Sequence, residues 1–116
     1  MDDLQKLAQL RLVSQMMLDV RLLKLERATQ ARQESLDHLA ELNRPAPATD
    51  LNPVLAGEVT MRYQLWADQR RSAINLVLAR QTAEWSDARK DASEAFGRNS
   101  VIGKLQDKRK MPTGRS

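Results

Sequence analysis

The chain contains no cysteine, and glycine, proline and aromatic residues are scarce. Among 116 residues there are four glycines, four prolines, two tryptophans, one tyrosine and one phenylalanine. Without cysteine the chain has no disulfide framework and no thiolate chemistry, and a reducing cytoplasm is permitted. The remaining composition, rich in alanine, leucine, glutamine and charged residues, is typical of long helices and coiled coils.

Long apolar runs are also missing. The longest run without a charged residue covers residues 72–79, far short of the ~20 residues that a membrane-spanning helix needs. The N-terminal residues contain two aspartates and are then interrupted by Lys6, Arg11 and Asp19, unlike a signal peptide. We therefore expect a soluble, cytoplasmic protein without membrane insertion.

Residue clusters that carry chemistry are not present in the sequence. The carboxylates are scattered, and no Ser/His/Asp set or glycine-rich phosphate loop occurs. His38 is the only histidine, and its place near the expected turn favours an exposed side chain over a metal ligand or a base. We expect no enzyme activity, no cofactor and no metal site.

Two helical stretches flank one proline-rich break. The pattern predicts an all-α, single-domain chain with a first helix over Asp3–Leu42, a turn over 43–52, a second helix over Pro53–Lys110 and a disordered tail over 111–116. Gly97, Asn99, Ser100 and Gly103 are weak helix formers that favour a break near 97–103. The fold class expected is an antiparallel two-helix coiled-coil hairpin with unequal arms.

Each helix carries a stripe with alternating steps of four and three residues, the pattern of a coiled-coil seam. The stripes run through positions 4, 8, 11, 15, 18, 22, 25, 29, 32, 36 and 39 on the first helix, and 67, 71, 74, 78, 81, 85, 88, 92 and 95 on the second. A turn near residue 48 would pair Gln15 with Gln81, Leu18 with Leu78 and Arg11 with Trp85.

This register leaves residues 95–110 without a partner in the chain, as a C-terminal overhang. The overhang is amphipathic and basic, since residues 104–116 hold five basic residues and one acidic residue and so account for the net charge of +4. Such a segment favours binding to a partner. The alternative is a disordered tail that binds nothing.

A second apolar surface is expected on the first helix. Apolar residues nearly encircle it between Leu10 and Leu25, whereas one facing helix covers a single stripe. The uncovered residues Val13, Met16, Val20 and Leu23 predict a second interface, with another copy or a different protein. The alternative is core packing against a kinked second helix.

A set of spaced positions recurs along the two predicted helices: residues 7–11, Trp66, 78–80, Trp85, Arg89, Ala92 and 95–98. The chain resembles the stalk proteins of type III export, the FliJ family of flagella and the YscO family of injectisomes, over most of its length. The likeness rests on the helical hairpin, its size and a few spaced positions, while the chain is somewhat shorter and its break richer in proline.

The resemblance implies a non-enzymatic coiled-coil stalk whose open end inserts into the ring of the export ATPase, and which contacts the export gate and substrate chaperones. It implies a cytoplasmic location, peripheral at the base of a membrane export apparatus. The unpaired end of the predicted hairpin would supply the partner contacts. The candidate partner-binding residues are Leu4, Leu7, Arg11, Phe96, Arg98, Ile102, Lys104, Leu105, Lys108 and Arg109.

Two other functions stay open. A homo-oligomeric scaffold, such as a homodimer, or a secretion chaperone would use the Leu10 to Leu25 surface to pair with itself or with a client helix. A nucleic-acid binder would use the basic tail and would show a steep salt dependence. The arms lack a basic stripe and interleaved aromatic residues, so nucleic acid ranks third.

Overall fold

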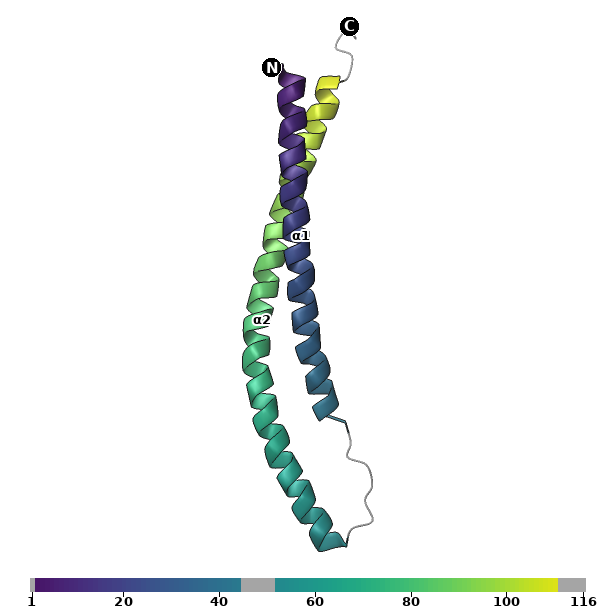
Figure 1. Cartoon of the computed structure of the whole chain (residues 1–116), viewed down its shortest axis with the longest axis vertical. Coiled ribbons are helices and arrows are strands. Elements are labelled where there is room, and N and C mark those ends of the chain that lie inside the picture. Colours follow the sequence, from purple (N-terminus) through teal and green to yellow (C-terminus); the bar gives the residue numbers. More distant parts are fainter. Residues whose placement is uncertain (1, 45–51, 111–116) are drawn as a thin grey trace. The chain divides into compact units, whose positions relative to one another are not determined.

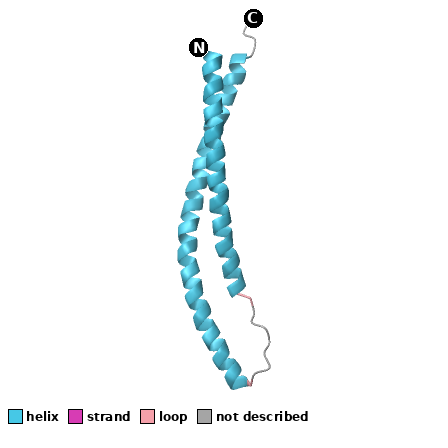
Figure 2. Cartoon of the chain, in the orientation of Figure 1, coloured by secondary structure: helices cyan, strands magenta, loops and turns pink. Residues whose placement is uncertain are grey.

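The computed structural model of the chain consists of two long helices. It describes residues 2–44 and 52–110, with α1 over Asp3–Leu42 and α2 over Pro53–Lys110 (Figure 1). Among these residues only helix and short loop segments occur (Figure 2), so the predicted all-α, two-helix class with unequal arms is confirmed. The expected disordered tail over 111–116 and residues 45–51 of the turn lie outside the described residues.

The starts of both helices have polar caps. Asp2 and Gln5 exchange two hydrogen bonds. The backbone N–H of Gln5 donates to the Asp2 carboxylate at 2.8 Å, and the backbone N–H of Asp2 donates to the side-chain oxygen Oε1 of Gln5 at 3.2 Å. This reciprocal pair is a capping box. At α2, the Leu55 amide donates to Asn52 Oδ1 at 2.9 Å, and Pro53 occupies the first helical position, where no amide hydrogen is needed.

The second helix is unbroken through residues 97–103, although a break was expected there. Asn99 is buried and Gly103 is buried as well, so both positions belong to the side of α2 that packs against α1. Tertiary packing overrides the weak helix propensity of these residues.

The contacts divide the chain into two compact units. Unit 1 combines residues up to Ala28 with residues from Glu84 onward, and unit 2 covers Thr29–Ala83. Each unit therefore contains part of α1 packed against part of α2. The buried apolar residues are few and include four alanines: Leu18, Leu42, Ala67, Ile74, Ala88, Ala92 and Ala95.

The predicted seam is correct on α2 and half correct on α1. Every predicted α2 position is buried or half-buried, whereas the α1 residues that are shielded from solvent fall mainly at positions 7, 11, 14, 18, 21, 25, 28, 32, 35, 39 and 42. Leu4 and Leu22 are exposed, while Ser14 and Ser35 are buried. Hydropathy predicts the leucines at the contact with α2, but the serines occupy it, because their small side chains allow the two helices to approach closely.

The predicted register is wrong. In unit 1, Asn99 Nδ2 donates to Gln15 Oε1 at 3.0 Å, and in unit 2, Ser35 Oγ donates to Gln81 Oε1 at 2.6 Å. Gln15 thus pairs with residue 99 instead of 81, a displacement of 18 residues or ~27 Å along a helix. Seams that repeat every seven residues allow several alignments, and the assumption of a turn near residue 48 selected the wrong one.

The unpaired stretch consequently lies at the start of α2 and not at its end. In unit 2 the α1 helix ends opposite Arg71, whose Nη2 donates to the carbonyl oxygen of Leu42 at 3.2 Å. Between Pro53 and Trp66 only Ala56 is half-buried, and every other residue is exposed. The predicted C-terminal overhang is therefore corrected.

Candidate partner-binding surface

The end of α2 packs against the beginning of α1 in unit 1. Besides the bond between Asn99 and Gln15, the Arg11 guanidinium lies against Gly103, where it occupies the position that a Cβ atom would take. Arg109 Nη1 lies 3.5 Å from Asp3 Oδ2, and Figure 1 shows the purple start of α1 beside the yellow end of α2. Residues 95–110 thus have a partner within the chain.

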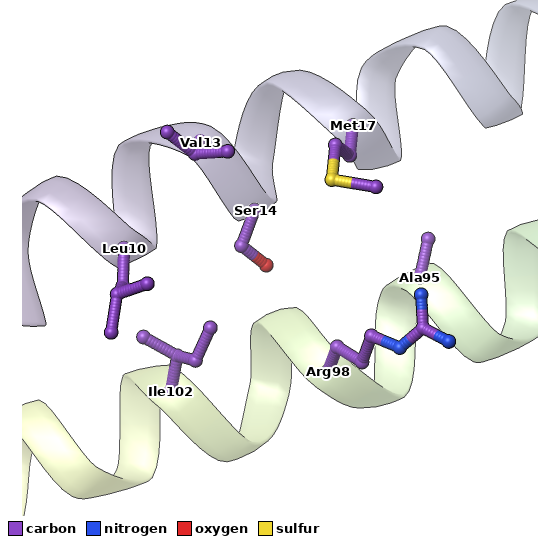
Figure 3. Close-up of a pocket in the computed structure, with 7 residues that line it drawn as sticks. All are labelled: Leu10, Val13, Ser14, Met17, Ala95, Arg98 and Ile102. Carbon is purple, nitrogen blue, oxygen red and sulfur yellow. The ribbon is translucent and has the colours of Figure 1, made fainter.

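A groove of about 150 Å³ lies between the two helices of unit 1. In Figure 3 the Leu10, Ser14 and Met17 side chains point from α1 toward α2, and Ala95 and Ile102 point from α2 toward α1. Val13 lies along α1, and Arg98 lies along α2. Most of the lining side chains are apolar, and Arg98 supplies the only charge among them. The lining residues are Leu10, Val13, Ser14, Met17, Ala95, Arg98 and Ile102.

A second hollow of about 240 Å³ repeats this arrangement one heptad along. Its lining residues are Asp3, Lys6, Leu7, Leu105 and Arg109. Asp3, Lys6 and Leu7 precede Leu10, Val13 and Ser14 by seven residues, and Leu105 and Arg109 follow Arg98 and Ile102 by seven. Positions seven residues apart lie on the same side of a paired helix. We call the two hollows together the unit 1 groove.

The structure places the predicted partner-binding residues in two groups. Leu7, Arg11 and Ile102 are half-buried in the contact between the helices, so they hold unit 1 together. The remaining seven are exposed: Leu4, Phe96, Arg98, Lys104, Leu105, Lys108 and Arg109. All four residues of the predicted second interface, Val13, Met16, Val20 and Leu23, are exposed as well.

Leu10 and Met17 were not among the predicted site residues, yet both line the groove and are about half exposed. With Val13 they have spacings of three and four residues, which is the signal that could have identified them. The signal was hidden because apolar residues nearly encircle this part of α1, so that only the correct register shows which of them border α2.

Unit 2 carries a further exposed apolar stretch, whose residues were not among the predicted site residues. Tyr63 and Trp66 lie with ring centroids 5.7 Å apart, and both border a hollow of about 310 Å³ beside His38 and Leu42. The exposed large apolar residues at the start of α2 are Val54, Leu55, Val59, Met61, Tyr63, Leu65 and Trp66.

Within 2–44 and 52–110, no group of three or more histidine, cysteine, aspartate or glutamate residues is placed to hold a metal ion. No helix in that part of the chain has the length and apolarity needed to cross a membrane. His38 is exposed, as expected. In comparisons with protein-family models, curated proteins and solved structures, the chain matches none of them.

Proposed function

We propose that the chain is a non-enzymatic stalk of a type III export apparatus that binds the ring of the export ATPase through unit 1. The resemblance of residues 7–11 and 95–98 to the export stalk families motivates the proposal. The observation that carries it is the exposure of large apolar side chains in unit 1 beside the basic end of α2. Leu105 is 45% exposed one helical turn before Lys108, and Lys108, Arg109 and Lys110 are in the last turn of α2. Phe96, farther from that end, is 63% exposed.

Exposed apolar residues next to cationic ones are suited to a partner that offers an apolar surface with an acidic border. Burying apolar area supplies most of the binding free energy, while charge complementarity steers association and selects the partner. The proposed place of action is the cytoplasm, peripheral to the base of a membrane export apparatus, where the stalk would also meet the export gate and chaperones.

The test is binding to a purified export ATPase and stimulation of its ATP hydrolysis. Residues after Ala95 pack against α1, so truncating the chain there would also remove part of the fold. Phe96→Glu combined with Lys108→Glu changes exposed positions only and should weaken binding by about tenfold or more. Leu76→Glu, at a residue of unit 2 that is 75% exposed, is the matched control and should bind normally.

Two results count against the stalk function. One is an unaltered chain that neither binds nor stimulates the ATPase. The other is a Leu76→Glu variant that loses as much binding as the double variant, because the effect would then not be specific to unit 1.

A second candidate function is a homo-oligomeric scaffold or secretion chaperone. It is favoured by the exposure of Met16, at 59%, and of Leu23, at 47%, because large apolar patches on a monomer mark interaction surfaces. Analytical ultracentrifugation separates the two functions. A dimer that dissociates when Met16→Glu and Leu23→Glu are combined supports the scaffold, and a monomer at all concentrations supports the lone stalk.

A further inference from the structure

We infer that the unit 1 groove is a docking site for one amphipathic helix of another protein, with an apolar stripe flanked by acidic residues. The inference rests on the geometry of unit 1 and not on the identity of the partner in the proposed function. Its first support is shape. The two hollows are lined on α1 by residues between Asp3 and Met17, a span of about 21 Å at ~1.5 Å per residue, which matches a partner helix of about four turns.

The second support is the apolar floor of the groove. Leu10 and Val13 are each 54% exposed and Met17 is 44% exposed, although all three border a hollow that already has two walls (Figure 3). A third helix in this position would bury them against its own apolar residues at spacings of three and four, the helix-in-groove mode of recognition.

The third support is charge. The groove contains Asp3, Lys6, Arg98 and Arg109, of which Asp3 and Arg109 lie at ion-pair distance from each other. Among the described residues, Lys6 and Arg98 have no carboxylate at ion-pair distance. Two cations that border an apolar floor favour acidic residues beside the apolar stripe of the bound helix and disfavour basic ones.

The experiment uses the full chain and two labelled synthetic peptides of about three heptads. Both peptides have the same leucine stripe, but glutamate flanks the stripe in one and lysine flanks it in the other. Fluorescence anisotropy should show that the glutamate peptide binds about tenfold tighter or more, with an affinity that falls as salt is added. Lys6→Glu combined with Arg98→Glu should reverse the preference.

A matched pair of variants locates the site. Leu10→Glu places a charge on the groove floor and should weaken binding of the glutamate peptide by about tenfold. Leu12 is 63% exposed and does not line the groove, so Leu12→Glu should leave binding within about twofold. Circular dichroism of both variants establishes that each retains its helical content.

Methyl NMR of the methionines gives an independent readout, in which the peptide should shift the Met17 signal and leave that of Met61, in unit 2, unchanged.

Three outcomes overturn the inference: equal affinity for both peptides, equal losses in Leu10→Glu and Leu12→Glu, or self-association of the chain that Leu10→Glu abolishes. The last outcome would assign the groove to a second copy. ATPase stimulation is a separate readout, so either proposal can fail alone.

Discussion

The guanidinium of Arg71 donates a hydrogen bond to the carbonyl oxygen of Leu42, the last residue of α1, over 3.2 Å. The same group bonds Asn43 Oδ1 at 3.1 Å and Asp68 Oδ1 at 2.7 Å. The last four carbonyl groups of a helix have no partner within it, and a cation near them is favourable. Within unit 2, Arg71 of α2 therefore binds the end of α1.

Replacing Arg71 by alanine should destabilise unit 2. Removing a charged donor from several acceptors costs about 1–3 kcal/mol, and the end of α1 should fray first. Thermal unfolding followed by circular dichroism measures the loss. Arg70→Ala removes a neighbouring exposed arginine and should change stability by less than about 0.5 kcal/mol. Equal losses in the two variants would show that Arg71 does not hold the end of α1.

Two helical glycines should respond differently to alanine. Apart from its chain neighbours and the adjacent backbone of its own helix, no atom lies within 4 Å of a Cβ added at Gly97, whereas one added at Gly103 would overlap the Arg11 guanidinium. Gly97→Ala should therefore gain the helix propensity of alanine, up to about 1 kcal/mol. Gly103→Ala should gain less, because Arg11 must move. A larger gain at Gly103, measured by thermal unfolding, would show that Arg11 does not pack on the glycine.

The alanines of the α2 seam set the spacing of the paired helices. Ala88 is 1% exposed, so Ala88→Leu adds three carbon atoms where no space exists and should cost about 1–3 kcal/mol. Ala83 is exposed, and Ala83→Leu is the control, expected within about 0.5 kcal/mol of the unaltered chain. Chemical denaturation of both variants checks this, and a neutral Ala88→Leu would mean that the helices are not in close contact there.

The sequence was sufficient for the helices but not for their alignment. Asp2 with Gln5 and Asn52 with Pro53 mark the helix starts through local capping chemistry, and such local signals are readable from sequence. The α2 residues that face α1 were predictable because they form one distinct stripe in the sequence. On α1 the choice of contact stripe was ambiguous. Leucines next to the true contact positions make a neighbouring stripe look more apolar than the one that contains Ser14 and Ser35.

The segments of the chain that carry the candidate site could be predicted from the sequence, but the face of the helix pair that forms it could not. Phe96, Arg98, Lys104 and Lys108 are exposed in unit 1 as expected, but they lie on a helix that is already paired instead of on a free overhang. Pairs of polar residues such as Gln15 and Asn99 determine the register, and which polar residues meet depends on contacts between distant parts of the chain. Hydropathy and spacing do not contain that information.

The end of α2 pairs with the start of α1 in unit 1, and the proposed binding surface consists of the sides of this pair. Because the chain has no native cysteine, disulfide trapping tests the pairing directly: Gln15→Cys combined with Asn99→Cys brings two thiols to facing positions. Mild oxidation should cross-link this variant within one chain and leave Gln15→Cys with Gln81→Cys reduced. Cross-linking of the second variant and not of the first would contradict the account.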